Sequence, residues 1–487
     1  MERDGNDMES ERTKKAATFL KAIAFCALFC LLFVTVTEIL KDKRMEGEYN
    51  PTTKVRGFYK EPKDTIDFIF LGSSQVYADI APAVLYRDYG MTSYDFCANE
   101  QPLWITYYYL KEALKRQKPK AVILDVFTVY GADYEEEGVN HINLDDLPMN
   151  LNKILAIRNG VPKELRYSYY FEIAKYHSTW EGMDQAKFEA TFKRGKDPMK
   201  GYSPFLTDQT YEESAKEEVV GQKECEEIPA RAQEWLIKII QLAREKNVEL
   251  LLLKTPNGNA DRQRLYNSVE KLAKEQGVPF LNLNTVLDGE AHINVLQAEK
   301  VTQTVGQYLN DNYTFTDKRG DAEYGDWEES VELFERYKLA CAMLYEKEPQ
   351  EYLDFLAKQS GYDYMLSING EDTGKETVTD SDKKVLESLK KIGFDLQAAK
   401  EEGMIALAES GGVTEQKQGT EAPAISKELD GRLFQLKLEK DDDTKKARLR
   451  IDGIQYNIAT SGIQLVVYDT ILHKAVDAVV LGEKVER

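Results

Sequence analysis

Cysteine is scarce in this sequence, with five residues among 487. Cys26 and Cys30 lie in an apolar stretch near the N-terminus, and Cys97, Cys225 and Cys341 are scattered through the rest. That spacing fits neither a disulfide framework nor a metal site, and the odd count leaves at least one thiol unpaired. The cysteines therefore exclude both kinds of site and leave the cellular compartment undecided.

Positive charge is also in short supply. The chain has 64 Lys and Arg against 84 Asp and Glu, a net charge of −20, and no Lys/Arg-rich run stands out. A nucleic-acid partner is therefore not expected. No G-x-G-x-x-G follows the first predicted strand, which argues against a dinucleotide-binding domain, and we predict no cofactor and no metal. The 42% of hydrophobic residues suffices for two to three domains.

One long apolar run lies near the N-terminus. Residues 16–36 read AATFLKAIAFCALFCLLFVTV, about the length that crosses a hydrocarbon core as a helix. Lys21 is its only charge and lies close enough to the start to reach the interface. A cleavable signal peptide is the alternative, but no A-x-A-like site follows and the run is long for such a signal. We predict a tail over 1–15 and a single-pass membrane anchor over 16–40.

After a polar segment at 41–63, which we predict to be a stalk, strand-like and helix-like patterns alternate. The predicted strands are 65–72, 93–96, 120–127, 248–256 and 278–284, and the predicted helices are 105–117, 234–246 and 262–276. Such alternation indicates an α/β fold with a parallel sheet flanked by helices. We assign this domain to 64–315, with an insertion at 129–230 between the third and fourth strands.

The remaining chain predicts two further segments. Residues 316–360 are charged and helical and form a connector. Residues 361–487 predict a mixed α+β, β-rich C-terminal domain. Its predicted strands are 364–370, 433–439, 447–453 and 463–469, and its predicted helix is 381–393.

The turn after the first predicted strand carries the sharpest chemical signal. The run IDFIFLG is followed by Ser73, Ser74 and Gln75. Ligands of open parallel sheets gather at the carboxyl ends of strands, where a serine hydroxyl is exposed as a nucleophile. The next helix N-terminus supplies backbone donors for an oxyanion. The alternative is a tight turn in which a serine only caps the helix.

A serine nucleophile needs a base, and histidine is the usual one near neutral pH. The chain has only four histidines: His141, His177, His292 and His473. His292 lies in DGEAHIN, just past the last predicted strand and before a helix, which places it on the same rim as Ser74. Asp288 or Glu290 would orient its ring.

The other histidines are weaker candidates. His177 either lines the site from the insertion or is a hydrogen-bonded core residue, and we predict His141 and His473 to be surface loop residues. Asp125, within KAVILDVF, is either a rim carboxylate or a hydrogen-bonded strand end.

Two of these blocks resemble a known superfamily. The strand followed by Gly-Ser-Ser, and the late His-Ile-Asn before a helix, resemble the first and last blocks of SGNH (GDSL) hydrolases. The similarity is greatest to the membrane-anchored branch of DltD-like, teichoic-acid D-alanylation proteins and of alginate-acetylation proteins. The anchor also suits that branch, as do ITYYYLKEAL at 105–114, KGY at 200–202 and KTP at 254–256. The resemblance covers about 61–315.

The resemblance implies an SGNH fold with Ser74 as nucleophile and His292 as base, in a domain exported behind a cytoplasmic N-terminus. The last block of that superfamily is Asp-x-x-His, whereas Asp288 is one residue too early for it. The oxyanion glycine after the second strand and the asparagine after the third are missing. The candidate oxyanion or binding residues are therefore Ser73, Asn99, Gln101 and His177.

A second, fainter resemblance concerns the C-terminal domain. IDGIQYN at 451–457, GIQLVVYD at 462–469 and AVDAVV at 475–480 are similar to PANDER/interleukin-like EMT-inducer modules. Modules of that kind are associated with carbohydrate binding, and no residue roles carry over.

These resemblances imply a single-pass membrane protein acting outside the cytoplasm as a serine esterase or O-acyltransferase. Its expected partner is a cell-envelope polysaccharide or teichoic-acid-like polymer, and a membrane-bound O-acyltransferase is a candidate protein partner. The alternative is a non-catalytic glycan-binding or assembly factor. The missing oxyanion residues favour that alternative, whereas the retained serine and histidine favour the enzyme.

Overall fold

The computed structural model describes most of the chain, which divides into two compact units. The described residues are 2–41, 51–131, 137–183, 185–192, 195–209, 217–219, 221–256, 262–285, 292–369, 380–394, 403–409, 412–418, 423–441, 444–459 and 462–487. The first unit comprises Met1–Ser203, Tyr211–His292 and Val301–Trp327, and the second comprises Pro204–Thr210, Ile293–Lys300 and Glu328–Arg487.

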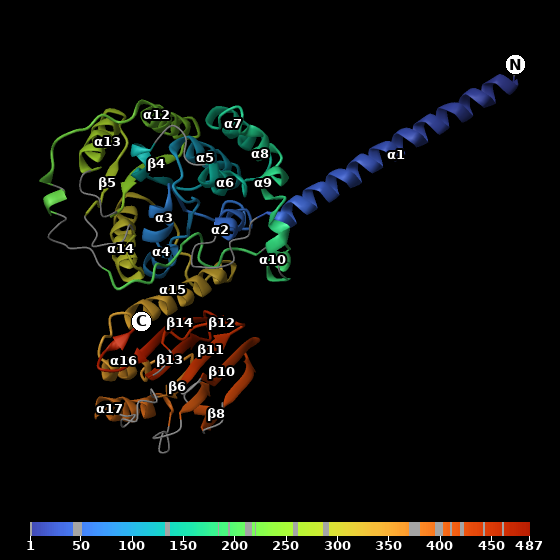
Figure 1. Cartoon of the computed structure of the whole chain (residues 1–487). Coiled ribbons are helices and arrows are strands. Elements are labelled where there is room, and N and C mark those ends of the chain that lie inside the picture. The colour runs from blue at the N-terminus through green and yellow to red at the C-terminus, as the bar shows by residue number, and fades with distance from the viewer. Residues whose placement is uncertain are drawn as a thin grey trace. The chain divides into compact units, whose positions relative to one another are not determined.

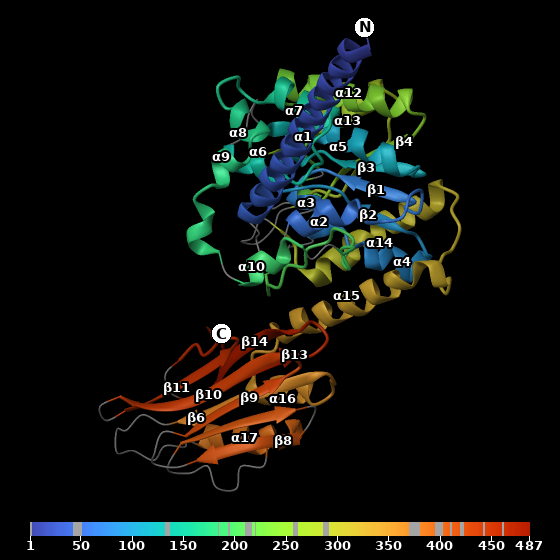
Figure 2. The same ribbon diagram turned by 90° about the vertical axis from the view of Figure 1, so that its right-hand side faces the viewer.

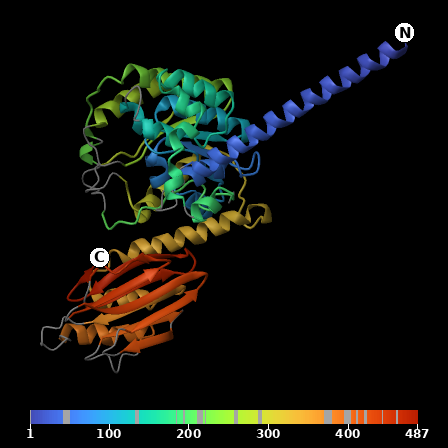
Figure 3. The same ribbon diagram turned by 45° about the vertical axis from the view of Figure 1, so that its right-hand side comes forward.

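The first unit begins with one long helix, α1 (Glu2–Leu40). Its segment Lys15–Leu40 is long and apolar enough to cross a membrane. Apolar side chains are exposed along most of this segment, including Phe19, Phe25 and Leu31, and the helix projects away from the rest of the unit, which it contacts at its C-terminal end (Figure 3). Exposed apolar side chains on every side of a helix are typical of a lipid-facing segment.

The segment predicted to be a stalk is partly folded into the first unit. Residues Pro51–Phe58 form helix α2, and Val55 and Phe58 belong to the main hydrophobic core. Phe58 stacks on Phe96 with 4.0 Å between ring centroids. The stalk prediction is therefore wrong for 51–58, because two apolar side chains one helical turn apart give this polar segment a buried face.

The centre of the first unit is a parallel sheet of five strands in the order β2-β1-β3-β4-β5. The strands are β1 (Phe68–Leu71), β2 (Ser93–Asp95), β3 (Ala121–Asp125), β4 (Glu249–Lys254) and β5 (Phe280–Asn282). Each lies within a predicted range, so the predicted α/β fold with a parallel sheet is confirmed. Strands β1 and β3 are buried throughout, as continuous apolar runs in a sheet covered on both faces require.

Helices cover both faces of this sheet (Figures 1 and 2). The helices outside the insertion are α3 (Ser74–Asp79), α4 (Pro82–Tyr89), α5 (Leu103–Arg116), α12 (Ala230–Glu245), α13 (Gln263–Glu275) and α14 (Val295–Asn312). On one face Ile69 and Val122 share a core with α5, α12 and α13. On the other, Phe68 packs edge-on against Tyr313, with 5.7 Å between centroids. Alternate residues of one strand thus serve opposite cores.

The insertion between β3 and β4 is mainly helical up to residue 190, and its described residues 195–209 and 222–229 are coil and turns. Its elements are η1 (Phe127–Tyr130), α6 (Glu137–Leu144), α7 (Leu151–Gly160), α8 (Arg166–Tyr170), α9 (Ile173–Tyr176), η2 (Thr179–Gly182) and α10 (Gln185–Ala190). Leu144, Ile157 and Tyr169 from three of these helices join the core beneath the sheet, so the insertion is part of the folded unit.

The second unit is β-rich, as predicted, and has two antiparallel sheets. A six-stranded sheet has the order β15-β14-β13-β6-β7-β8 and a four-stranded sheet the order β12-β11-β10-β9. The strands are β6 (Tyr362–Asn369), β7 (Met404–Glu409), β8 (Gly412–Gln418), β9 (Ala424–Leu429), β10 (Arg432–Asp441), β11 (Thr444–Ile451), β12 (Ile454–Gln455), β13 (Gly462–Asp469), β14 (Lys474–Leu481) and β15 (Val485–Glu486).

Two cores sandwich the larger sheet of this unit. One lies between the sheets and contains Met365, Val466 and Phe434. The other lies between the larger sheet and the helices α16 (Pro349–Leu356) and α17 (Asp380–Leu389). Two elements precede α16 in the chain, η4 (Ala322–Tyr324) and α15 (Gly325–Met343). The short helix η5 (Lys390–Ile392) follows α17. Most of the predicted connector, from residue 328 onward, clusters with this unit.

A buried ion pair in the second unit gives the first prediction. Arg336 on α15 lies 2.8 Å (Nε) and 2.7 Å (Nη2) from Asp469 Oδ2 at the end of β13, and both side chains are buried. Asp469→Ala leaves the guanidinium charge uncompensated, so we expect it to lower the free energy of unfolding by about 3–5 kcal/mol. Urea unfolding of the full chain measures this.

The matched control is Lys391→Ala, which removes the exposed pair between Lys391 and Asp354. Exposed pairs contribute about 1 kcal/mol or less. A loss for Asp469→Ala no larger than that of Lys391→Ala would contradict the assigned role of the buried pair.

Candidate active site

The strand order places the turn after β1 at a switch point of the sheet. Strand β2 lies on one side of β1 and β3 on the other, so the connections after β1 and β3 leave in opposite directions. Ligands of open α/β sheets bind outside the carboxyl ends of the strands at such a point. Gly72 closes β1 with φ of 148°, and a Cβ there would lie 3.0 Å from Cβ of Asp125 at the end of β3. Glycine thus lets the two turns meet closely.

The two serines of this turn have different surroundings. Ser73 is the N-cap of α3, and its hydroxyl accepts a hydrogen bond from the Gln75 amide at 3.5 Å. This is the capping role that the alternative interpretation of the turn assigns to a serine. Ser74 begins the helix and is 5% exposed. Ser74 is therefore the nucleophile candidate of the pair, and Ser73 supports the turn.

His292 lies against the same short helix, although it is 217 residues from Gln75 in the sequence. Its Nδ1 is 3.1 Å from Nε2 of Gln75, and its ring centroid is 6.4 Å from that of Tyr77. Both residues belong to the turn and helix that carry Ser74. No hydrogen bond joins Ser74 Oγ to the His292 ring in the part of the chain that the structure describes. The structure thus brings the predicted base beside the predicted nucleophile without bonding them.

The protonation state of His292 suits a base. Burial, and after it the positive charge of Lys254, lowers the pKa of His292 to about 4, so the ring is neutral at pH 7. If Gln75 donates through its Nε2, then His292 Nδ1 accepts that hydrogen bond, and the proton of the neutral imidazole lies on His292 Nε2. If the Gln75 amide is flipped, its Oε1 accepts a hydrogen bond from Nδ1–H of His292, and His292 Nε2 becomes the acceptor that a base requires.

Two opposite charges lie buried at the carboxyl ends of β3 and β4. Asp125 accepts hydrogen bonds from the backbone N–H of Phe127 at 2.9 Å and of Thr255 at 3.3 Å. Lys254 donates to the Thr255 carbonyl, and its Nζ lies 5.2 Å from the ring centroid of Tyr266. Burial lowers the pKa of Lys254 to about 8, against the opposing effect of Asp125, and burial raises the pKa of Asp125.

A buried lysine with a lowered pKa at this edge of the sheet is a candidate functional residue that the sequence analysis did not identify. Its signal in the sequence is a lysine that closes the apolar run LLLLK. Gln75 was also missed as a candidate, because a glutamine one residue after a serine has no distinctive pattern.

The residues after β2 divide into one that faces α3 and one that does not. Asn99 Oδ1 accepts a hydrogen bond from the Tyr77 hydroxyl at 3.3 Å, so Asn99 and His292 contact the same tyrosine. Gln101 is fully buried, donates to Asn143 at 3.1 Å and accepts from Thr106 at 3.0 Å. Because both ends of its amide serve internal contacts, Gln101 is better explained as a structural residue than as an oxyanion donor.

Two other predicted site residues are not brought into this group. His177 is exposed, and its Nδ1 lies 3.0 Å from the Ala174 carbonyl oxygen in the same turn. The alternative prediction of a core position for His177 is therefore wrong. In the described residues it has no hydrogen bond to the β1–α3 turn. Asp288 and Glu290 lie outside the described residues, so the triad acid stays a prediction.

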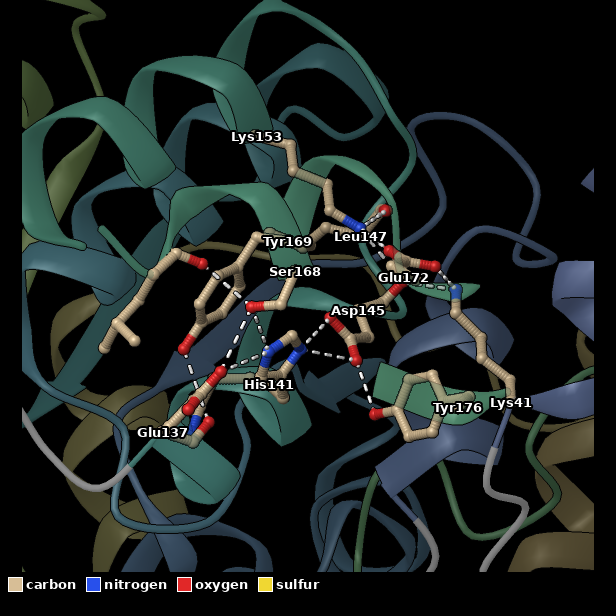
Figure 4. A network of polar contacts seen from close by, with 12 residues as sticks. Lys41, Glu137, His141, Asp145, Leu147, Lys153, Ser168, Tyr169, Glu172 and Tyr176 are labelled. Atoms are coloured by element: carbon tan, nitrogen blue, oxygen red, sulfur yellow. Dashed lines mark hydrogen bonds and ion pairs between the residues drawn. The ribbon is translucent and has the colours of Figure 1, made fainter. Parts of the chain in front are cut away.

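A second serine, histidine and aspartate meet within the insertion (Figure 4). His141 Nδ1 lies 2.9 and 3.0 Å from the two carboxylate oxygens of Asp145, and Nε2 lies 3.2 Å from Ser168 Oγ. The ring stacks on Tyr169 with 3.8 Å between centroids. The prediction of a surface position for His141 is wrong, because α6 buries it completely and both ring nitrogens have polar partners there.

This second cluster is sealed and serves the structure. The His141 ring is completely buried, whereas His292 is only half-buried, and Ser168 and Asp145 are buried as well, so a substrate has no access to the His141 ring. Asp145 also accepts from the Tyr176 hydroxyl at 2.6 Å, and its carbonyl accepts from Lys41 Nζ at 2.8 Å and Lys153 Nζ at 3.1 Å. The cluster thus connects the insertion helices to the residue that follows α1.

Comparison with known proteins gives little. No protein-family model matches the chain, and no curated protein matches it. Among solved structures, one described as a gut microbial diltiazem-metabolizing enzyme is similar at 12% identity over 80% of this chain, with a TM-score of 0.15. The aligned region spans 59% of that structure's chain, and so low a TM-score carries no argument about fold or function.

The lowered pKa of His292 predicts a pH-dependent stability. An ordinary histidine has a pKa of 6.5 and the folded His292 about 4, so between these values the unfolded chain binds the proton more readily. The stability contribution of the neutral ring is therefore lost as the pH falls from 6.5 to 4. We expect His292→Gln to reduce the fall in Tm across this window, as measured by circular dichroism.

The matched control is His177→Gln, which removes an exposed histidine. A fall in Tm that is the same in His292→Gln, His177→Gln and the unaltered chain would rule out this linkage.

Proposed function

We propose that this chain is a membrane-anchored serine esterase or O-acyltransferase, with Ser74 as nucleophile and His292 as general base. The observation that carries the proposal is the 3.1 Å contact between Gln75 and His292. That contact joins the last block of the α/β domain to the turn after β1, at the switch point where ligands of such sheets bind. A neutral imidazole beside a serine on a helix start supports acyl transfer.

The reaction proceeds in two steps. Neutral His292 takes the proton of Ser74 Oγ as that oxygen bonds to the ester carbonyl carbon. His292 then returns the proton to the leaving oxygen, the bond from the carbonyl carbon to the alcohol breaks, and the acyl group stays on Ser74. Water or a polymer hydroxyl, deprotonated by His292, then attacks the carbonyl carbon of this ester; the bond from that carbon to Ser74 Oγ breaks, and His292 returns the proton to Oγ. Catalytic hydrogen bonds are often long in ligand-free structures and tighten with substrate.

Gln75 acts as a positioning residue in this proposal. The group that holds Nδ1 of a catalytic histidine fixes its tautomer and orientation. A glutamine can accept from Nδ1–H through Oε1, although without the charge that stabilises an imidazolium. This predicts a base that is correctly oriented and weaker than one held by a carboxylate.

The negative charge that develops on the carbonyl oxygen requires donors. The Ser74 amide at the start of α3 and the side-chain amide of Asn99 are the proposed donors. The buried ammonium of Lys254 adds positive charge at the same edge of the sheet, where the low dielectric strengthens its effect.

The proposed kind of substrate takes the anchor and the second unit together with the family resemblance. We propose a cytoplasmic N-terminus, with both units outside the cytoplasm and beside a cell-envelope polysaccharide or teichoic-acid-like polymer. The antiparallel sheets of the second unit would hold a glycan chain, and a membrane-bound O-acyltransferase would supply acyl groups. This part of the proposal depends on the family resemblance.

Two observations favour a non-catalytic alternative. Ser74 Oγ has no hydrogen bond to His292 in the described part of the chain, and Gln75 Nε2 is the amide atom beside Nδ1. In that tautomer His292 donates through Nε2 and is not a base. A glycan-binding or assembly factor would use the same edge of the sheet to bind and not to react.

Substitution of the two central residues tests the proposal. Ser74→Ala and His292→Ala should each lower the hydrolysis of a small acetyl ester by the full chain in detergent by about a hundredfold or more. The control for His292 is the exposed His177→Ala, and Ser168→Ala tests the serine of the sealed cluster. Activity unchanged in Ser74→Ala, or lost only in Ser168→Ala, would refute the assignment.

Gln75→Glu tests the positioning role. A carboxylate beside Nδ1 stabilises the imidazolium, so the acidic limb of the pH dependence of kcat/KM should move upward from near pH 4 by about one to two units. Gln75→Leu removes the hydrogen bond, and we expect kcat to fall with little change in KM. An acidic limb at the same pH in Gln75→Glu and the unaltered enzyme would contradict this role.

A further inference from the structure

Large apolar side chains are exposed on the insertion helices. Five aromatic residues there are between 45% and 65% exposed: Tyr167, Phe171, Trp180, Phe188 and Phe192. We call these five the aromatic collar. Phe188 and Phe192 pack against each other with 5.3 Å between centroids. Soluble proteins seldom expose grouped aromatic side chains without a binding role.

Two members of the collar, Phe171 and Trp180, are sequence neighbours of residues that contact the end of the apolar helix α1. Lys41, the residue after that helix, forms an ion pair with Glu172 at 2.7 Å, and both side chains are buried. The Thr179 hydroxyl donates a hydrogen bond to the Leu40 carbonyl. The exposed Phe171 and Trp180 are the immediate neighbours of these two contacts.

Several ion pairs hold this attachment. Glu172 also pairs with the buried Lys153 at 2.6 Å, and Arg56 on α2 bridges Glu38 at 3.0 Å and Asp146 at 2.7 Å. Buried, multiply paired charges fix the geometry in which they meet. Helices α9 and α10 accordingly lie beside the base of α1 in two views at right angles (Figures 1 and 2).

The length of α1 sets the depth of this attachment. The 26 residues of Lys15–Leu40 span about 39 Å as a helix, against a hydrocarbon core of about 30 Å. If the helix crosses the bilayer, its C-terminal end emerges in the headgroup region. Trp and Tyr are enriched at that level, because their rings sit well between apolar tails and water.

We infer that the aromatic collar seats in the lipid headgroup region around the end of α1 and holds the first unit against the bilayer surface. The occupant of this apolar surface is lipid, because the side chains adjoin the contacts to the membrane helix itself. The inference rests on the proposed anchor and not on the proposed esterase activity. It explains why aromatic side chains stay exposed on a unit whose other tryptophans, Trp104, Trp235 and Trp327, are buried.

The fluorescence of Trp180 reports directly on contact between the collar and lipid, because α1 contains no tryptophan and the other three tryptophans of the chain are buried. The full chain is reconstituted into phosphatidylcholine vesicles with or without bromine on the acyl chains near the headgroups. We expect brominated lipid to quench tryptophan emission, and Trp180→Phe to abolish most of that quenching. Acrylamide, which stays in the water, should quench the emission of Trp180 less when the chain is in vesicles than when it is unfolded in urea without detergent.

A displaced tryptophan is the matched control. Lys271 is exposed on α13, on the side of the first unit away from α1 (Figure 1), and Lys271→Trp in the Trp180→Phe background should be quenched by acrylamide and not by brominated lipid. Emission from Trp180 that responds to acrylamide and not to brominated lipid would overturn the inference and point to a protein partner. Loss of the chain from vesicles after a carbonate wash would overturn the anchor and this inference together, whatever the esterase assay shows.

Discussion

Parallel strands must be joined by crossover connections, and in the first unit that constraint gathers every carboxyl end of the sheet at one edge. The turns after β1 and β3 and the residues that end β4 meet there, which is why Ser74, Asp125 and Lys254 share a region although long stretches of chain separate them. Because the strands are buried on both faces, their ends are the points at which the sheet can present polar groups to a ligand.

Burial shapes the chemistry of this edge more than any single charge partner. Desolvation is the leading cause of the lowered pKa values of His292 and Lys254 and of the raised pKa of Asp125. His292 is therefore a neutral imidazole at pH 7, and Lys254 loses its proton near pH 8. Both groups can take part in proton transfer close to neutral pH. The same burial explains why the second histidine cluster is inert: its serine and histidine have the right partners and no access.

The predictable part of the fold was the part with continuous apolar runs. The strands 120–127 and 248–256 were identified because a strand buried on both faces has no polar alternation. The segment at 51–58 was misread because only Val55 and Phe58 mark its buried face. His141 was misread for a similar reason, since its polar partners Asp145 and Ser168 come from other turns of the insertion, and a short helix gives no sign of which neighbours will cover it.

The sequence by itself determined the apolar helix, the parallel α/β unit and the pairing of a Gly-Ser-Ser turn with a late histidine, because each depends on local periodicity or on the order of strands along the chain. The folded structure alone decided that Gln75 meets His292, that Ser73 is a cap, and that Gln101 is internal. It also decided that Lys41 is locked to Glu172 beside a group of exposed aromatic residues. Apart from the Ser73 cap, whose partner Gln75 is two residues away, these contacts join residues of separate elements, and their geometry follows from how helices pack on the sheet, which no local pattern encodes.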